Sequence, residues 1–563
     1  MVKNYSNFTR EELLEEVKKL EKRKKYGIVW EDKPEKVAEM CKEKLPVLEE
    51  DKDKVINTDK EKPFNFLIEG DNYHTLSVLN YTHKNKIDMI YIDPPYNTGN
   101  DDFVYDDKYV DAEDAFRHSK WLSFMEKRLT LAKNVLKDTG IIFISIDDNE
   151  LANLRLLCDE IFGIDNFIAI FVWKRRSGAN DPKNLVSTDH EYILSYKKSN
   201  KTTLKGIKKD LSNYKNPDND PRGPWAAGDL TCGKTRVERP NLFYEITDPK
   251  TGNIYKANVN RVWRFEKNRM LKEIKDGKII FPKKEGGTPQ YKRFAKDLRS
   301  GFKPLSTWIE ASTTNKKEIV AEEDEYEIRI MQSDLNQTAT KELRELFGRQ
   351  VFNYPKPKRL IKELIKNSAD DDAVILDFMA GSGTTGQAVL ELNKEDGGNR
   401  TFILCTNNEN NICTEVCYPR INKVIKILEK EAKSKLVSEM PGNLKYFKTD
   451  FVNAEPTDIN KEKMVKKSTE MLCLKEECFE EKAHGNNFKI FINKDEKLLG
   501  IVYSDSGILP IKKEIAKLNK KFIVYVFSLD DSARDDQFEE IKNLVELRPI
   551  PAVILNVYRG IFK

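Results

Sequence analysis

The sequence lacks several features that would define a class of protein. It has no run of about 18 apolar residues, which a membrane-spanning helix needs. Its N-terminus has no apolar stretch of the kind found in secretory signals. Only five histidines are present, and the eight cysteines form no Cys-x-x-Cys pair, so the pattern of a structural zinc site is missing. These absences predict a reduced, cytoplasmic protein without membrane contact and without a metal.

Charge is distributed unevenly along the 563 residues. The whole chain carries +4, yet residues 201–300 hold 24 Lys and Arg against 12 Asp and Glu. Aromatic residues, among them Trp225 and Trp263, lie between these basic residues. A basic, aromatic-rich block within a near-neutral chain favours a local anionic partner. A solvated, lysine-rich surface is the alternative that composition alone leaves open.

The chain is too long for one ordinary hydrophobic core, which predicts several domains. Residues 9–25 have the pattern of a charged helix, and the last part mixes strands with an acidic helix at 535–546. We expect five parts: a charged N-terminal segment (1–62), two halves of one α/β core (63–200 and 341–440), an insert between the halves (201–340) and a C-terminal α+β domain (441–563).

Apolar strands alternate with amphipathic helices in both halves of the predicted core. Such continuous apolar strands predict a sheet that helices cover on both faces. The strands are expected at 63–71, 86–92, 140–147, 166–174, 191–197, 373–378 and 400–408. The helices are expected at 72–83, 115–137, 149–163, 384–393 and 424–435.

The stretch DFMAGSGTTGQ (377–387) contains a G-x-G-x-x-G pattern between a predicted strand and a predicted helix. In a dinucleotide site the glycines directly follow the strand, so that a phosphate meets the helix N-terminus. Here Asp377 ends the strand, and Phe378 and Met379 come before the glycines. A carboxylate at this place suits a ligand with an α-amino group and a sulfonium. The loop therefore favours S-adenosylmethionine over a nicotinamide dinucleotide.

The four residues Asp93-Pro94-Pro95-Tyr96 directly follow the predicted strand 86–92. Ligands bind at the carboxyl ends of strands in open α/β sheets, and neither proline can donate to the strand ladder. The proline after Asp93 also keeps that residue extended. Such a stiff turn matches a planar base with an amino group: Asp93 and the Pro94 carbonyl can accept its two hydrogens, and Tyr96 can stack on its ring. An ordinary strand-to-loop turn is the alternative.

With these motifs the sequence resembles the adenine-specific DNA methyltransferases of the β permutation, most closely the modification (Mod) subunits of type III restriction–modification systems. The resemblance rests on DPPYNTGNDDFVY (93–105), FNYPKP (352–357) and DFMAGSGTT (377–385), and it extends over most of the chain. One departure is that the F-x-G-x-G pattern has one extra residue. The resemblance implies an α/β, Rossmann-like, S-adenosylmethionine-dependent methyltransferase core, with circularly permuted motif order and a mixed seven-stranded sheet.

The resemblance also implies a role for each motif residue. The catalytic residues would be Asp93, Pro94, Pro95 and Tyr96. The cofactor would be held by Asp71, Phe352, Lys356, Pro357, Asp377, Phe378, Gly381, Gly383, Thr384 and Glu409, with Asn407 as the alternative to Glu409. The insert 201–340 would be the target-recognition domain, and its DNA-binding candidates are Arg222, Lys234, Arg236, Arg239, Arg261, Arg264 and Arg293. For any single one of these seven residues, we expect a phosphate contact or plain solvent exposure rather than a contact with a base edge.

The activity that the resemblance implies is site-specific methylation of double-stranded DNA at the N6 amino group of a flipped adenine. Residues 63–200 would be the catalytic half and 341–440 the cofactor-binding half, while 441–563 would serve assembly. Mod subunits form dimers and pair with a Res translocase–nuclease, so a homodimer and a Res partner are expected. Three alternatives stay open: an orphan methyltransferase without Res, a DNA-binding specificity subunit without methylation, and a cytosine amino-methyltransferase.

Overall fold

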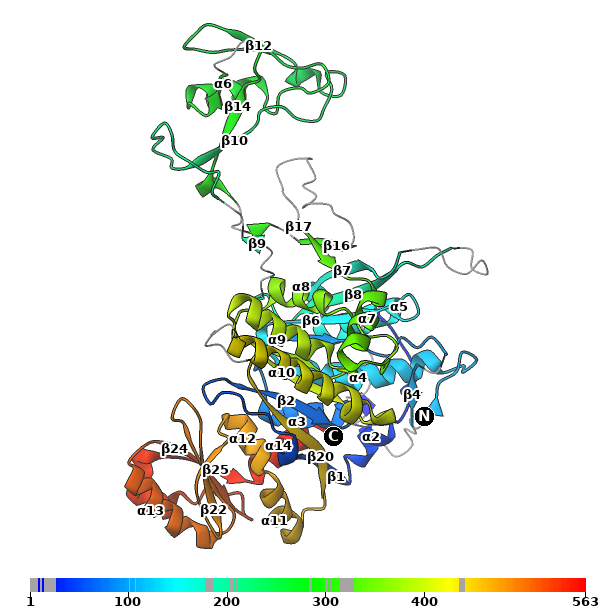
Figure 1. The fold of residues 1–563 in the computed structure, drawn as a ribbon, viewed down its shortest axis with the longest axis vertical. Coiled ribbons are helices and arrows are strands. Elements are labelled where there is room, and N and C mark those ends of the chain that lie inside the picture. Colours follow the sequence, from blue (N-terminus) through cyan, green and yellow to red (C-terminus); the bar gives the residue numbers. More distant parts are fainter. Residues whose placement is uncertain are drawn as a thin grey trace. The chain divides into compact units, whose positions relative to one another are not determined.

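The structure is a computed structural model in which two compact units can be recognised (Figure 1). We call residues 1–203, 307–314 and 332–563 the core unit, and residues 204–306 and 315–331 the insert unit. Most of the helix predicted at 9–25 lies outside the described residues. The structure describes residues 9–10, 13–14, 27–100, 102–106, 108–177, 186–202, 204, 207–208, 211–282, 286–298, 302–303, 305–312, 329–434 and 441–562.

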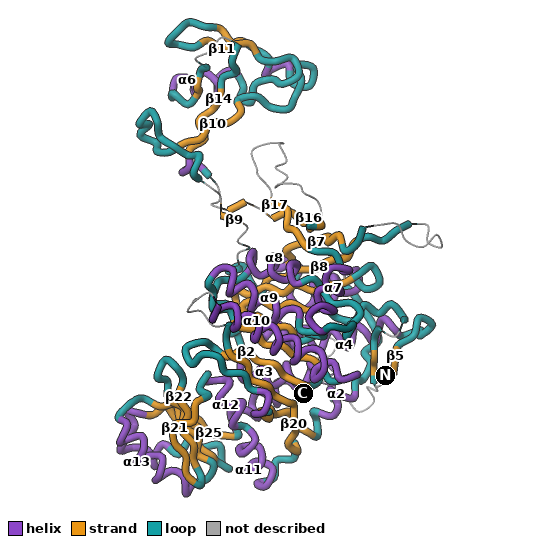
Figure 2. The backbone as a smooth tube through the Cα atoms, viewed as in Figure 1, coloured by secondary structure: helices purple, strands orange, loops and turns teal. Residues whose placement is uncertain are grey.

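A large mixed sheet, eleven-stranded over the described residues, forms the centre of the core unit (Figure 2). Its strand order is β1 (Lys44–Glu50), β20 (Asn443–Asn453), β2 (Phe64–Glu69), β19 (Thr401–Thr406), β18 (Val374–Asp377), β3 (Ile87–Ile92), β6 (Leu136–Ile146), β8 (His190–Lys197), β7 (Phe167–Lys174), β16 (Leu305–Ala311) and β17 (Arg329–Ser333).

The seven consecutive strands from β2 to β7 are the predicted mixed sheet. Neighbours from β2 to β6 are parallel, and β8 is antiparallel to both β6 and β7. The prediction of an α/β core with a mixed sheet is therefore confirmed, but the sheet is larger than expected. At one edge β20 pairs with β2 in parallel and β1 pairs with β20 antiparallel. At the other edge β16 pairs with β7 in parallel.

Two groups of helices cover the sheet (Figure 1). One group is α3 (Asn72–Thr82), α4 (Arg117–Val135) and α5 (Leu151–Phe162), which contact one another in sequence. The other group is α8 (Lys358–Ser368), α9 (Thr384–Asp396) and α10 (Tyr418–Ser434), which are joined through α9. Apart from Asp88 and the terminal Asp377, the central strands β3 and β18 consist of apolar residues, most of which are buried.

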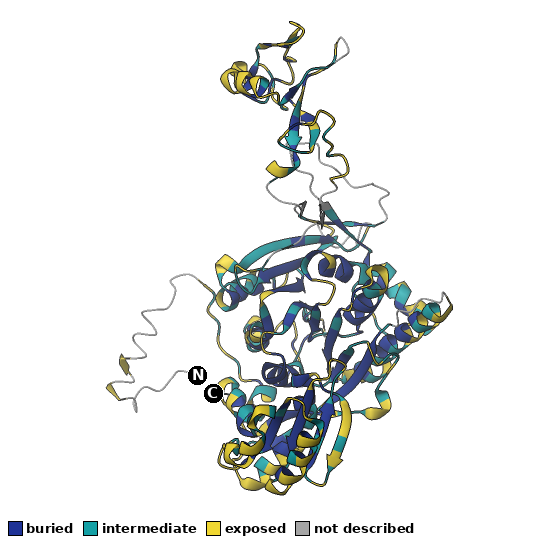
Figure 3. Cartoon of the chain, turned by 90° about the vertical axis from the view of Figure 1, so that its left-hand side faces the viewer, coloured by how far each residue is buried: buried dark blue, intermediate teal, exposed yellow. Residues whose placement is uncertain are grey.

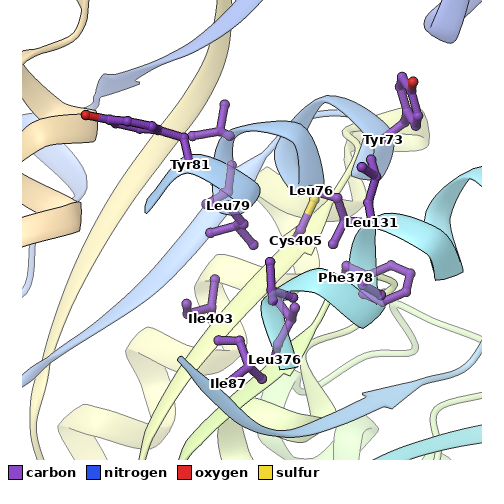
Figure 4. Close-up of a cluster of buried hydrophobic side chains, with 14 of the residues drawn as sticks. Tyr73, Leu76, Leu79, Tyr81, Ile87, Leu131, Leu376, Phe378, Ile403 and Cys405 are labelled. Atoms are coloured by element: carbon purple, nitrogen blue, oxygen red, sulfur yellow. The ribbon is translucent and has the colours of Figure 1, made fainter. Parts of the chain in front are cut away.

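Buried residues of the large sheet, of α3, α4 and α5 and of the C-terminal part form one large apolar cluster of the core unit (Figure 3). Figure 4 shows its centre, where Leu76 and Leu79 of α3 lie close to side chains of β18 and β19. Phe378, the residue directly after β18, belongs to this cluster and is 0% exposed. The strand ends are thus fixed in position by packing on both sides of the sheet.

The C-terminal part of the core unit contains a second, five-stranded sheet within the described residues. Its strands are β21 (Glu480–Gly485), β22 (Phe488–Ile492), β23 (Leu498–Val502), β24 (Phe522–Phe527) and β25 (Val545–Ile550), and its helices are α11 (Asp458–Lys467), α12 (Thr469–Glu476), α13 (Ile508–Leu518) and α14 (Ala552–Ile561). The helix predicted at 535–546 is wrong in type, because it is a 3₁₀ helix, Asp535–Leu544, that leads into β25. The hydroxyl of Tyr558 on α14 donates to the Pro46 carbonyl of β1 at 2.5 Å.

The insert unit is built from short strands and long loops. Its three-stranded sheet has the order β10 (Trp225–Asp229), β14 (Gln290–Phe294) and β13 (Ile279–Ile280), and beside it are the hairpin β11 (Glu245–Thr247) and β12 (Ile254–Lys256) and the helix α6 (Lys267–Lys275). Its small core includes Leu230, Trp263 and Met270.

The division of the chain into five parts stays a prediction. The insert unit lies inside the range 201–340, but β20 comes from the range predicted for the C-terminal domain and yet belongs to the large sheet. In the part of the chain that the structure describes, no helix is long and apolar enough to span a membrane.

Candidate active site

The carboxyl ends of β2, β19, β18 and β3 meet at one edge of the large sheet because these strands run in parallel. In the register of the sheet, Leu376 of β18 lies beside Ile90 of β3. Asp377 ends β18, and Asp93 directly follows β3. Two motifs that are far apart in the sequence are therefore neighbours at the edge where open α/β sheets bind ligands.

Hydrogen bonds of buried side chains hold the Asp93–Tyr96 turn and the residue that follows it in place. The indole Nε1 of Trp121, on α4, donates to the Pro95 carbonyl at 2.7 Å. Asn97, which is wholly buried and has a φ of 57°, donates from Nδ2 to Oε1 of Glu150 at 2.5 Å. Glu150 is itself wholly buried and also contacts Nδ1 of His118 at 2.6 Å. These hydrogen bonds add to the restraint that the two prolines place on the turn.

Lys356 contacts the predicted catalytic carboxylate. Its Nζ lies 2.8 Å from each carboxylate oxygen of Asp93 and 4.8 Å from the centroid of the Tyr96 ring. Burial raises the pKa of Asp93, and the charge of Lys356 opposes this effect without cancelling it. Burial works against the charge of Lys356, but Asp93 and Glu191 outweigh it and raise the pKa of the lysine. Lys356 was predicted as a cofactor-binding residue, and that role stays a prediction; the structure places its ammonium against the catalytic turn.

Glu191 is a site residue that the sequence analysis did not identify. It is 4% exposed and lies near the start of β8. Its Oε2 accepts from the Tyr96 hydroxyl at 3.1 Å and lies 3.5 Å from Lys356 Nζ. Its Oε1 lies 3.2 Å from Nη1 of Arg175. Because β8 is antiparallel to β6, its first residues reach the edge where the parallel strands end. The sequence feature that could have identified Glu191 is an acid near the start of an otherwise apolar strand, in DHEYILSYKK (189–198).

The loop after β18 has the geometry that a glycine-rich loop requires. Gly381 and Gly383 have φ values of 48° and 80°, which side chains rarely tolerate. A Cβ at Gly383 would lie 2.9 Å from Sγ of Cys417. Asp377 accepts from the Met379 N–H at 3.0 Å and from the Thr385 hydroxyl at 2.5 Å. Burial raises the pKa of Asp377 to about 7, although these two hydrogen bonds lower it.

Arg420 on α10 is a second residue that the sequence analysis missed. It is 3% exposed and donates to Ser382 Oγ at 2.9 Å, to Thr384 Oγ1 at 2.8 Å and to Gln387 Oε1 at 2.8 Å. Burial lowers its pKa to about 10. The guanidinium therefore fixes the glycine loop to the start of α9. The sequence gives no signal for this role, since Arg420 is one basic residue among several on an amphipathic helix.

The other predicted cofactor residues occupy different surroundings. A Cβ at Gly381 would lie 3.8 Å from Cζ of Phe352, so the Phe352 ring lies against the glycine loop. Pro357 is buried and precedes the first residue of α8. The side chain of Phe378 packs in the core (Figure 4), so it has no exposed surface of its own. Thr384 is buried, with its hydroxyl engaged by Arg420.

Asp71 and Glu409 lie just after the strands β2 and β19 at the same edge. Asp71 caps α3 by accepting from the Tyr73 N–H at 2.7 Å, and its carboxylate lies 3.6 Å from Nη2 of buried Arg128. Glu409 is exposed in the 3₁₀ turn Glu409–Asn411. The capping role of Asp71 fixes its direction, whereas Glu409 is free to turn toward a ligand. The described residues contain no group of three His, Cys, Asp or Glu side chains that could hold a metal.

Some of the predicted DNA-binding residues are paired with acids inside the insert unit. Arg222 donates to both oxygens of Asp220 at 2.7 and 2.6 Å. Arg261 Nη2 lies 2.6 Å from Asp229 Oδ2, and Lys234 Nζ lies 3.1 Å from an oxygen of Glu238. These contacts give Arg222 a structural role, since Asp220 is buried.

Other basic residues of the insert unit rest on aromatic rings or line a cavity. Arg236 lies 4.7 Å from the Phe243 ring, Arg264 lies 5.9 Å from the Phe265 ring, and Arg239 is exposed. An open cavity of about 1130 Å³ is lined by Arg261 and Arg293 together with aromatic residues such as Trp263. The insert unit thus presents both arginines and rings to a concave surface.

Comparison with known proteins assigns the chain to a family. A Mod subunit of the type III restriction–modification enzyme StyLTI, from Salmonella typhimurium, is 38% identical over 64% of this chain and 55% of its own length. The type II methyltransferase M.KpnI, from Klebsiella pneumoniae, is 35% identical over 62% of this chain and 82% of its own length. The EcoP15I Mod subunit of Escherichia coli is 31% identical over 63% of this chain and 60% of its own length.

Among solved structures, a putative DNA modification methylase of Thermus thermophilus, complexed with S-adenosyl-L-methionine, is 14% identical over 68% of this chain and 99% of that chain, with a TM-score of 0.29. A likeness at this level adds nothing to the assignment. This chain spans little more than half the length of the Mod subunits that it matches. The sequence model of a DNA methylase family matches residues 87–416, which include the Asp93–Tyr96 turn and the loop after β18. The chain therefore belongs to this DNA methylase family.

Proposed function

We propose that this protein transfers a methyl group from S-adenosylmethionine to the N6 amino group of an adenine in double-stranded DNA. The observation that carries the proposal is the adjacency of Asp93 and Asp377 at the ends of the paired strands β3 and β18. The end of β3 offers hydrogen-bond acceptors to the amino group of a base. The end of β18 leads into a glycine-rich loop that would hold S-adenosylmethionine, the methyl donor. The family assignment supports methylation of DNA.

The residues of the loop after β18 fit S-adenosylmethionine. Gly381 and Gly383 have left-handed φ values that side chains rarely tolerate, and the Phe352 ring lies against Gly381. Asp71 and Glu409 lie just after β2 and β19, the next strands along the edge, where the adenosine part would lie. Asp377 would hold the amino-acid part, and it also fixes the loop through Met379 and Thr385. When bound, this cofactor supplies a methyl group on an electrophilic sulfonium.

The residues of the catalytic turn act by position and by hydrogen bonding. The lone pair of an adenine amino group is delocalised into its ring, which makes the nitrogen a poor nucleophile. Asp93 and the Pro94 carbonyl accept its two hydrogens and so localise the lone pair toward the methyl group. Trp121 fixes the turn through the neighbouring Pro95 carbonyl. Tyr96 stacks on the base, which has to leave the duplex to reach this pocket.

Adenine is proposed rather than cytosine because, in the methyltransferases that this sequence resembles, an acid before the two prolines is more typical of adenine methylation and a serine of cytosine methylation. The same turn could accept the two hydrogens of a cytosine N4 amino group, and the matching family is named for both N6 and N4 methylation. Tyr96 is compatible with either ring. Cytosine is therefore the second candidate, and the identity of the methylated nucleoside separates the two.

The insert unit is proposed to bind the DNA target. Exposed Arg236 and Arg239 and the cavity lined by Arg261 and Arg293 suit phosphates and base edges. The Mod relatives further support a role as the modification subunit of a type III restriction–modification system, with a Res subunit as partner. A homodimer is proposed from the same resemblance, and an orphan methyltransferase remains the alternative context.

The test is transfer of labelled methyl groups from S-adenosylmethionine to DNA, followed by digestion and mass spectrometry of the nucleosides. N6-methyladenine is the expected product, and it should vanish in the Asp93→Ala variant. Formation of N4-methylcytosine would favour the second candidate. DNA binding without any methylated nucleoside would favour a specificity subunit.

A further inference from the structure

Lys356 contacts the carboxylate of Asp93, which the proposed function needs as a hydrogen-bond acceptor for the amino group of the base. Its ammonium lies 2.8 Å from both oxygens of Asp93, and its side chain is 10% exposed. A charge-assisted hydrogen bond of this kind is stronger than one from a neutral amine. The amino group of a base therefore competes with the ammonium for Asp93, and the carboxylate becomes the stronger acceptor for the base when the ammonium moves away. Because the lysine is buried, it needs another anionic partner close by.

Glu191 is such a partner. Its Oε2 lies 3.5 Å from the same Nζ, so a short movement of the ammonium would exchange Asp93 for Glu191. Glu191 is 4% exposed and is fixed on its other sides by the Tyr96 hydroxyl and by Arg175. This cluster has no net charge, because the carboxylates of Asp93 and Glu191 are matched by the ammonium of Lys356 and the guanidinium of Arg175. The ammonium can therefore shift within the cluster without leaving a buried charge unpaired.

We propose that Glu191 is a positioning residue that draws the Lys356 ammonium away from Asp93 when the target base enters, and this inference rests on the proposed function. The same carboxylate keeps Tyr96 in place through its hydroxyl, so one residue clears the acceptor and orients the stacking ring. No proton or covalent bond is transferred in this step. Only the partner of the Lys356 ammonium changes.

The test is a double-mutant cycle between Glu191 and Lys356, read as the single-turnover rate of methyl transfer at saturating S-adenosylmethionine and DNA. Glu191→Gln keeps an acceptor for the Tyr96 hydroxyl but removes the charge that attracts the ammonium. We expect its rate to fall about 10- to 100-fold, the range that a hydrogen bond to a charged group represents. In the Lys356→Met background, where no ammonium blocks Asp93, the same substitution should cost less than about threefold.

Glu150→Gln provides the matched control. Glu150 is also a buried carboxylate beside the catalytic turn, but it holds Asn97 and His118 rather than Lys356. Its substitution should slow the reaction by the same factor in both backgrounds. Equal costs of Glu191→Gln in both backgrounds, or a wild-type rate for Glu191→Gln alone, would overturn the inference while leaving the proposed function intact. A wild-type protein that methylates no DNA would instead overturn the proposed function, and this inference with it.

Discussion

Asp93 and Asp377 occupy equivalent places at the ends of neighbouring strands, but their surroundings differ. Asp93 is partly exposed, and a lysine ammonium contacts both of its oxygens. Asp377 is 3% exposed, and its partners are a backbone N–H and a hydroxyl of its own loop. One carboxylate is therefore placed for exchange of partners, whereas the other stabilises the conformation of a loop. Both carboxylates lie at the edge of the sheet where a ligand can bind, and the different hydrogen-bond partners of Asp93 and Asp377 give them different roles.

The largest expected effect comes from removing the charge at Asp93. Asp93→Asn keeps the shape of the side chain but weakens the acceptor for the amino group. We expect the single-turnover rate of methyl transfer to fall about 10²- to 10³-fold, as for loss of one preorganised charge-stabilising group. Binding of S-adenosylmethionine, measured by calorimetry, should remain. A variant with wild-type rate would show that Asp93 is not the acceptor.

The loop that Asp377 stabilises can be broken at Gly383. Gly383→Ala places a Cβ 2.9 Å from Sγ of Cys417 at a φ of 80°. The strain should lower the free energy of unfolding by about 1–3 kcal/mol, measured by urea denaturation, and should weaken cofactor binding. Gly560→Ala on α14 is the control, because a Cβ there meets nothing within 4 Å. Equal stability of the two variants would contradict the loop geometry described above.

The pH dependence of the free energy of unfolding tests whether Asp377 is as deeply buried as the structure shows. Because the folded pKa of about 7 is above the usual 3.8, the wild-type fold is relatively more stable when this carboxyl is neutral, and it loses that stability as pH rises through about 7. Asparagine is neutral at every pH. Asp377→Asn should therefore gain stability relative to wild type between pH 4 and about 7, and the gain should level off above that range.

Asp450→Asn is the control for that pH series. Lys467 holds the pKa of Asp450 below its usual value, although burial opposes this effect. The contribution of Asp450 is therefore lost only at lower pH, and its variant should show a flat difference from wild type between pH 5 and 8. Denaturation midpoints of the two variants, measured across this range, provide the comparison. Parallel curves for both variants would contradict the burial of Asp377.

The smallest expected effects separate the basic residues of the insert unit. Arg236→Gln removes an exposed charge and should reduce the slope of DNA affinity against salt by about 1, with little change in stability. Arg222→Gln breaks the two hydrogen bonds to buried Asp220, so it should lower the thermal midpoint of unfolding instead. Fluorescence anisotropy with DNA at several salt concentrations checks the first effect. Unchanged salt slopes in both variants would argue against DNA binding at this surface.

Much of the core and the two strand-end motifs could be predicted because the information is local. An apolar strand followed by an acid and a proline or glycine turn identifies Asp93 and Asp377 without knowledge of the sheet order. Glu191 could not be recognised in this way, since its position depends on β8 being antiparallel to β6. Arg420 depends on how α10 packs on the glycine loop. The outer strands of the large sheet were also missed, because pairing between β1 and β20 joins distant parts of the chain.

The most direct test of the central claim is the modification that the protein leaves on a genome. A host without its own DNA methylation should express the chain, and single-molecule sequencing should map the modified bases. We predict N6-methyladenine at one defined sequence motif, and its loss in the Asp93→Ala variant. Methylation confined to cytosine N4, or DNA without motif-linked methylation, would contradict the account.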